Sequence, residues 1–203
     1  IVYSVGLIEP AAFRAILKVR RMEFLWAVAA AFGVLVFGTL QGIVVAIVLS
    51  TIGLASQTAH PRVSVIGRKR GTDMRPLSSE HPDDETFDGL LIARPQGRLY
   101  FLNAQFVAEQ LDALVVQHAP RVLTIDLSRV PDIEYSALQM LAQLDQRMAE
   151  RDVTVWLAGL NPDAMEAVRN AGLDTQFGPE RMLFNARDAV ARFQASAAGA
   201  GTR

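Results

Sequence analysis

The chain has 203 residues, a formal net charge of −1 and no cysteine, which excludes disulfide staples and thiolate metal sites. Its three histidines are far apart in the sequence and show no metal-ligand spacing. Polarity is uneven: residues 24–56 contain no Asp, Glu, Lys, Arg or His, whereas the sequence from Pro61 onward has the mixed polarity of a soluble domain.

The chain begins with an apolar stretch, residues 1–8, that has no methionine, basic segment or cleavage site and so differs from a signal peptide. We interpret this start as a cut and expect that an upstream part is missing. In residues 9–23, Arg14, Lys18 and Arg21 share one helical face, with apolar residues on another. This pattern indicates an amphipathic helix on the cytoplasmic membrane surface. A solvated linker helix is the alternative.

The apolar run 24–56 predicts a membrane protein, because about 18 uncharged apolar residues can already cross a bilayer. A single helix of this length would measure about 50 Å, against a hydrocarbon core of about 30 Å. Two glycines and an amide interrupt the run at Gly38–Gly42. We therefore expect a short transmembrane hairpin of helices 24–37 and 43–56. A single tilted span is the alternative.

Basic residues flank the run on both sides: Arg14, Lys18, Arg20 and Arg21 before it, and Arg62, Arg68, Lys69, Arg70 and Arg75 after it. Basic residues near membrane ends mark the cytoplasmic side. Both ends of the run should therefore be cytoplasmic, which requires an even number of crossings.

Residues 61–87 have the proline, glycine and serine content of a linker. The first part of this segment is basic and should lie near anionic headgroups. The last part, residues 80–85, is acidic and is most simply a solvated loop.

From residue 88 onward, strand and helix patterns alternate. Two short apolar runs, 90–93 and 99–102, surround a Pro-Gln-Gly turn and predict a hairpin. Asn103 then follows as the predicted N-cap of a helix.

The remaining elements continue this alternation. Residues 122–125 and 153–157 are predicted strands, and the chain ends with a predicted helix over 185–193. Between them, a helix should begin at Asn161-Pro162 and end at Gly172. Such alternation favours a mixed α/β sheet with helices packed on it.

Several short motifs follow one another in a specific order: Leu7-Ile8-Glu9, Phe37-Gly38, Gln41-Gly42-Ile43, Val65-Ile66-Gly67-Arg68, Leu99-Tyr100-Phe101-Leu102-Asn103-Ala104, Ile125-Asp126-Leu127-Ser128 and Asn170-Ala171-Gly172-Leu173. In order and spacing they resemble the C-terminal end of a SulP anion transporter, in which a last membrane hairpin precedes a STAS domain. The resemblance implies a STAS-type mixed sheet and a role in a secondary transporter of sulfate, bicarbonate or related anions. The STAS domain would regulate or help assemble the carrier.

This resemblance also implies an organisation and a location. Residues 1–60 would end the membrane domain, 61–87 would be the linker and 88–203 the cytoplasmic STAS domain of a multi-pass protein of the cell membrane. The expected partners are the lipid bilayer, the rest of the membrane domain and an inorganic anion bound by upstream helices. We expect a possible homodimer, no cofactor, no bound metal and no nucleic acid.

One loop departs from the phosphorylated relatives. STAS domains of anti-sigma-factor antagonists have an Asp-Ser-Ser-Gly-like motif whose first serine accepts phosphate, and Glu134-Tyr135-Ser136-Ala137 stands there in this sequence. Tyrosine replaces the acceptor, and Ser136 would act as a helix N-cap. We expect Asp132, Glu134, Tyr135 and Ser136 to form a regulatory or partner loop that is a constitutive contact surface.

Two other functions compete with this interpretation. The first is a free-standing, membrane-anchored STAS signalling module of the anti-sigma-antagonist type. The second is an enzyme that uses Asp126, Asp132 and Glu134 as an acid–base or metal cluster. The sequence shows no histidine, activated nucleophile or phosphate-binding glycine loop to complete such a site. We therefore expect no catalytic residues and no enzyme activity.

Overall fold

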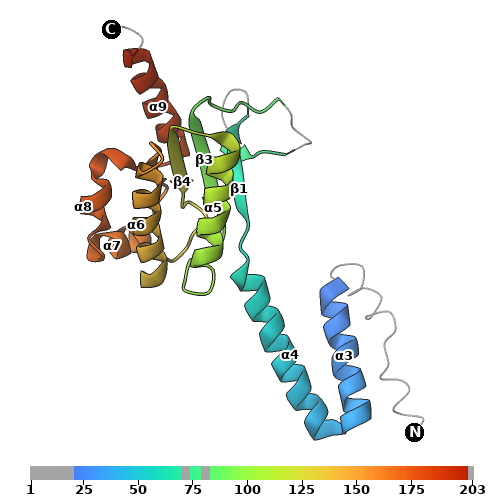
Figure 1. The fold of residues 1–203 in the computed structure, drawn as a ribbon. Coiled ribbons are helices and arrows are strands. Elements are labelled where there is room, and N and C mark those ends of the chain that lie inside the picture. Colours follow the sequence, from blue (N-terminus) through green and yellow to red (C-terminus); the bar gives the residue numbers. More distant parts are fainter. Residues whose placement is uncertain (1–20, 70–73, 79–82, 201–203) are drawn as a thin grey trace. The chain divides into compact units, whose positions relative to one another are not determined.

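The computed structural model describes residues 21–69, 74–78 and 83–200 (Figure 1). The chain divides into two compact units, Ile1–Gln57 and Thr58–Arg203. Apart from its last three residues, the predicted amphipathic helix 9–23 lies outside the described residues.

The apolar run forms two helices, α3 (Arg21–Phe37) and α4 (Thr39–Ala59), which confirms the predicted pair. The break is narrower than expected, because only Gly38 leaves the helical conformation, with a φ of 84°. The backbone N–H of Gly42 already donates to the carbonyl of Gly38 at 2.9 Å. Glycine adopts positive φ at little cost, so one residue is enough to interrupt the helix.

Glycines bring the two helices into close contact. A Cβ atom on Gly42 would lie 2.5 Å from the Cα atom of Val34, and one on Gly53 would lie 3.0 Å from the Trp26 ring. Gly42, early in α4, meets Val34, late in α3, and Gly53, late in α4, meets Trp26, early in α3. The two helices are therefore antiparallel. Small residues at helix contacts are typical of membrane helix packing.

Large apolar side chains remain exposed along both helices: Leu25, Val28, Phe32, Val34, Leu35, Val36, Leu40, Ile43, Val44, Ile47, Val48, Ile52 and Leu54. Residues 39–56 of α4 are long and apolar enough to cross a membrane, whereas the apolar part of α3, residues 24–36, is shorter. Water-exposed apolar surface of this extent is unusual in a soluble protein.

The second unit contains a six-stranded mixed sheet with the strand order β2-β1-β3-β4-β5-β6. Its strands are β1 (Val63–Arg68), β2 (Met74–Pro76), β3 (Leu90–Pro95), β4 (Val122–Asp126), β5 (Thr154–Ala158) and β6 (Met182–Leu183). Strands β3 to β6 are parallel to one another, and β1 is antiparallel to both β2 and β3. The sheet confirms the predicted mixed α/β class.

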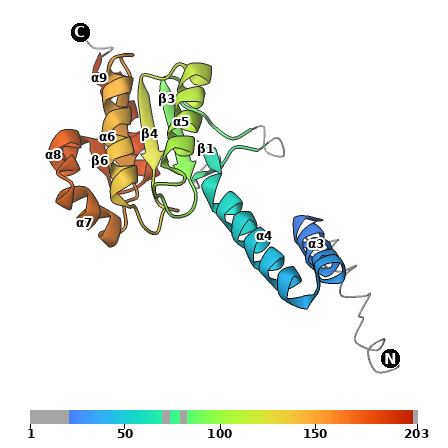
Figure 2. The ribbon, with the colours of Figure 1, turned by 60° about the horizontal axis from the view of Figure 1, so that its bottom comes forward.

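Helices cover both faces of the sheet (Figures 1 and 2). They are α5 (Ala104–His118), α6 (Tyr135–Ala149), α7 (Pro162–Asn170), α8 (Leu173–Phe177), the short 3-10 helix η1 (Pro179–Arg181) and α9 (Ala186–Ala200). The larger apolar core lies between the sheet and α5, α6, α7 and α8. A smaller core packs α9 against the opposite face. Alternating strand positions supply the two cores, as expected for a sheet buried on both sides.

Two helix ends confirm the sequence prediction. The side chain of Asn161 accepts a hydrogen bond from the N–H of Ala164 at 2.8 Å, with Pro162 in the first helical position. Gly172 follows the end of α7 with a φ of 73°. The last helix begins at Ala186, one residue after the expected start, and continues to Ala200, beyond the expected end at residue 193.

The predicted hairpin of residues 90–93 and 99–102 is wrong. Strand β3 pairs with β1 on one side and with β4 on the other, and Leu99 forms only an isolated parallel bridge with Ile133. Residues 61–87, expected as a linker, instead supply β1 and β2. The reason is that β1 gives β3 an antiparallel neighbour, which leaves no sheet position for residues 99–102.

Candidate functional site

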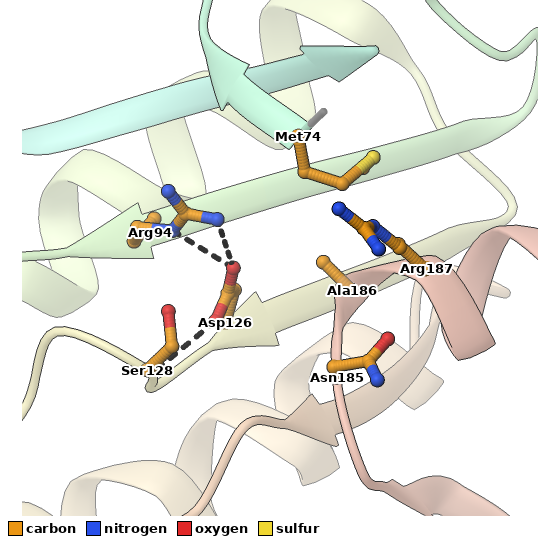
Figure 3. A pocket seen from close by; sticks show the side chains of 7 residues that line it. All are labelled: Met74, Arg94, Asp126, Ser128, Asn185, Ala186 and Arg187. Carbon is orange, nitrogen blue, oxygen red and sulfur yellow. Dashed lines mark hydrogen bonds and ion pairs between the residues drawn. The ribbon is translucent and has the colours of Figure 1, made fainter. Parts of the chain in front are cut away.

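A cavity of about 360 Å³ opens at the carboxyl ends of β3 and β4 (Figure 3). Its walls come from β2, β3, the end of β4 and the N-terminus of α9: Met74, Arg94, Asp126, Ser128, Asn185, Ala186 and Arg187. Parallel strands commonly place ligand sites at this end of a sheet.

A buried ion pair forms one wall of the cavity. Nε and Nη2 of Arg94 lie 2.8 and 2.6 Å from the same Oδ2 atom of Asp126. The side chains of Asp126 and Arg94 are only 1% and 12% exposed. The backbone N–H of Ser128 donates to Oδ1 of Asp126 at 3.0 Å. Both carboxylate oxygens are therefore engaged, as a buried charge requires.

A glycine allows the turn after β5 to approach this pair. Gly159 has a φ of 70°, and a Cβ atom there would lie 3.0 Å from both Oδ1 of Asp126 and Cβ of Ser128. On the opposite wall, Asn185 caps α9, since its Oδ1 atom accepts from the N–H of Asp188 at 2.9 Å. The polar groups of this end of the sheet are thus held by backbone contacts from several loops.

Beside the cavity, the basic and acidic parts of segment 61–87 pair with each other. Arg75 binds Asp84 with two hydrogen bonds of 2.7 and 2.8 Å, and Arg68 binds Glu85 at 2.7 Å. The hydrogen bond to Asp84 raises the pKa of Arg75 above its usual value. The expectation of a merely solvated acidic loop is wrong for Asp84 and Glu85, because the antiparallel bridge between Arg68 and Glu85 aligns opposite charges.

The predicted partner loop forms a separate surface cluster. Arg98 lies 2.8 Å from Asp132 and 2.9 Å from Glu134, and all three side chains are substantially exposed. Asp126 pairs with Arg94 instead, so the three carboxylates considered for an enzyme site do not act as one cluster. Within the residues that the structure describes, no group of three His, Cys, Asp or Glu side chains is arranged to hold a metal.

Ser136 does not cap α6, which corrects the expectation from the sequence. The helix begins at Tyr135 with Glu134 as its N-cap, and the Oγ atom of Ser136 is buried without a hydrogen bond. The bridge between Leu99 and Ile133 fixes the chain just before Glu134, so the helix starts earlier than expected. Tyr135 is 70% exposed at this start.

Sequence reasoning missed Arg94, Asn185 and Arg187. Arg94 had one available signal, because it is a charged residue within the otherwise apolar strand segment of β3. Its partner was obscured because the predicted strand ends at residue 125, whereas Asp126 is the last residue of β4. Register resolves this: Ala93 pairs with Ile125, which places Arg94 and Asp126 at neighbouring positions.

Comparisons with known proteins agree on one family. Residues 81–190 match the STAS domain. High affinity sulfate transporter 2 of Stylosanthes hamata is 26% identical over 199 residues, covering 93% of this chain and 30% of the transporter. A Mycobacterium tuberculosis protein named "probable sulfate transporter" is 27% identical over 197 residues, covering 96% of this chain and 35% of that protein.

A solved structure shares the fold. The murine Solute Carrier 26 family member A9 anion transporter, in the inward-facing state, superposes with a TM-score of 0.76 at 18% identity. The match covers 93% of this chain and 31% of that one. This chain therefore spans only about a third of the length of the transporters it resembles. The chain belongs to the STAS-domain family and is homologous over nearly its whole length to sulfate transporters of the SulP family.

Proposed function

We propose that this chain is the C-terminal portion of a secondary anion transporter of the sulfate or bicarbonate type. One observation carries the proposal: the match to sulfate transporters spans 93–96% of the chain and so includes both the apolar helices and the STAS domain. A carrier of this kind binds its anion at half-helices near the bilayer midplane. Those helices would lie upstream, so the portion described here would not transport by itself.

In this proposal, α3 and α4 lie in the cell membrane of a multi-pass protein, and the STAS domain is cytoplasmic. The exposed apolar side chains of both helices support burial in lipid, and the close glycine contact supports a paired arrangement. The basic residues on both flanks support cytoplasmic ends. The shorter α3 requires support from its partner helix, because about 20 apolar residues make a comfortable span.

The STAS domain would regulate or assemble the carrier through its surface, with the rest of the membrane domain or a second copy as partner. The loop of Asp132, Glu134, Tyr135 and Ser136 is proposed as a constitutive contact surface. Tyr135 supports this role because its side chain is exposed beside an ion-paired, ordered loop. Replacing Tyr135 with alanine should then reduce transport without lowering the stability of the domain.

The direct test is uptake of radiolabelled sulfate and bicarbonate by proteoliposomes that contain the intact protein. Uptake that saturates with anion concentration supports the proposal. A version of the protein that ends at Gln57 keeps the membrane helices and lacks the STAS domain. If that domain regulates or assembles the carrier, this version should show an altered rate of anion uptake or an altered assembly. Intact, correctly inserted protein that moves neither anion would contradict the transporter assignment for these substrates.

A further inference from the structure

We propose that Phe101 and Leu102, in the loop before α5, contact the lipid headgroup surface of the bilayer. Residues 100–102 are called the membrane-contacting tip. Its contact with lipid would be additional to the proposed transporter role, and it rests on one part of that role, namely that residues 39–56 cross the bilayer. The tip would hold the STAS domain against the membrane through side chains of its own.

A buried asparagine fixes the tip to Thr58, which follows the apolar run in the sequence. Asn103 is 1% exposed, and its Nδ2 atom donates to the carbonyls of Thr58 at 3.1 Å and Arg98 at 2.9 Å. Its Oδ1 atom accepts from the N–H of Tyr100 at 3.0 Å. Each hydrogen-bonding group of this side chain has a partner, so residues 98–103 are held next to Thr58, within the second unit.

Chain connectivity then limits the distance to the membrane. Thr58 follows Ser56, the last residue of the candidate span, by two positions. Consecutive Cα atoms are about 3.8 Å apart, so those two residues are separated by at most about 7.6 Å in any arrangement of the two units. The headgroup region is about 5–7 Å thick on each side of the hydrocarbon core. Residue 58 and the loop bound to it therefore belong at the membrane–water boundary.

The exposed side chains of the tip suit that boundary. Phe101 is 71% exposed and Leu102 is 42% exposed, and the Tyr100 ring packs edge-on against Phe101 with centroids 5.6 Å apart. Tyr and Trp rings are enriched at membrane interfaces, and Tyr100 supplies such a ring beside Phe101. A single exposed phenylalanine would need no explanation elsewhere on the surface. Here it lies two residues from the asparagine that binds Thr58.

The surrounding charge favours an anionic lipid surface. Arg62 and Arg129 border the start of this loop, since their carbonyls accept from the N–H groups of Gln96 and Gly97 at 3.0 and 3.1 Å. Neither arginine forms an ion pair with another described residue, whereas the carboxylates of Asp132 and Glu134, which also border this loop, are both paired with Arg98. Basic side chains next to a membrane are attracted to anionic headgroups. A lipid surface therefore fits the tip better than an acidic protein partner with no apolar face.

The absence of cysteine permits a clean test by single-cysteine labelling of the 203-residue chain. An environment-sensitive fluorophore is attached to the single cysteine of Phe101→Cys or, separately, of Leu102→Cys. Each labelled protein is placed in nanodiscs of phosphatidylcholine and phosphatidylglycerol. A nitroxide lipid is the quencher. Val116→Cys is the matched control, because Val116 is 74% exposed near the other end of α5. Ile47→Cys, in the middle of the candidate span, reports membrane insertion.

The lipid quencher should reduce fluorescence at Ile47, Phe101 and Leu102 and leave Val116 unchanged. Quenching at Ile47 with none at Phe101 or Leu102 would overturn this inference while leaving the membrane assignment intact. No quenching at Ile47 would overturn both. Labels at Phe101 and Leu102 that are shielded from aqueous iodide, yet insensitive to the lipid quencher, would indicate a protein partner and refute lipid contact.

Discussion

Replacing Arg94 with methionine should destabilise the STAS domain far more than removal of any surface arginine. Asp126 is 1% exposed and would keep only the N–H of Ser128 as a partner for its negative charge. Removal of one member of a buried ion pair costs about 3–5 kcal/mol, because the other charge is left without compensation. Methionine fills a similar volume, so the effect reports on charge rather than on a cavity.

The magnitude follows from the size of the domain. A urea m-value of about 2 kcal/mol/M is typical of a small domain, so a cost of about 4 kcal/mol lowers the unfolding midpoint by about 2 M. Arg98→Met is the matched control, since Arg98 is 56% exposed and its pairs with Asp132 and Glu134 lie on the surface. Such surface pairs contribute about 0–1 kcal/mol.

The assay is urea unfolding of the second unit, Thr58–Arg203, followed by circular dichroism. The double variant Arg94→Met with Asp126→Leu should recover most of the lost stability, because it removes the buried charge together with its partner. Equal midpoints for Arg94→Met and Arg98→Met would refute the reasoning. A double variant no more stable than Arg94→Met alone would do the same.

Three further predictions concern other parts of the chain. Residues 58–203 should melt cooperatively and residues 88–203 at a clearly lower temperature, because the shorter fragment lacks β1 and β2; equal melting temperatures would show these strands to be dispensable. Gly42→Val should lower the thermal aggregation midpoint of the chain in detergent, whereas Ile43→Val should not, because a side chain at Gly42 would meet the backbone of Val34 and Ile43 is half exposed. Ser136→Ala and Ser136→Asp should not shift anion uptake by the intact protein in opposite directions, since the loop is proposed as a contact surface rather than a phosphorylation switch; opposite shifts with phosphate on Ser136 in cells would contradict this.

Elements defined by local patterns were predictable from the sequence. The helix break at Gly38 and the cap at Asn161 depend on the residue at one position, and the structure confirms both. The parallel strands β4 and β5 are apolar runs of the kind that a buried sheet requires.

Pairing between distant segments was not predictable in the same way. The local sequence of residues 90–93 and 99–102 resembles a hairpin, but the antiparallel neighbour of β3 is β1. Strand β1 lies before β3 in a segment that has the composition of a linker. The hydrogen bonds of Asn103 show the same limit: its position before a helix was recognisable, but its bond to Thr58, 45 residues away, was not.

The candidate site was only partly visible for this reason. The loop residues Asp132, Glu134, Tyr135 and Ser136 lie close together in the sequence and were identified together. The pair of Arg94 and Asp126 joins residues 32 positions apart, and its recognition needs the register of two parallel strands. A charged residue inside a buried strand is the one local sign that such a partner exists.

The sidedness of two single cysteines in intact cells tests the central claim most directly, namely that α3 and α4 form a membrane hairpin with the STAS domain in the cytoplasm. Thr39→Cys, next to the break at Gly38, should react with a membrane-impermeant maleimide from outside or be shielded within the bilayer. Ala59→Cys, at the end of α4, should react only after the cells are permeabilised. Labelling of Ala59→Cys from outside intact cells would contradict the account.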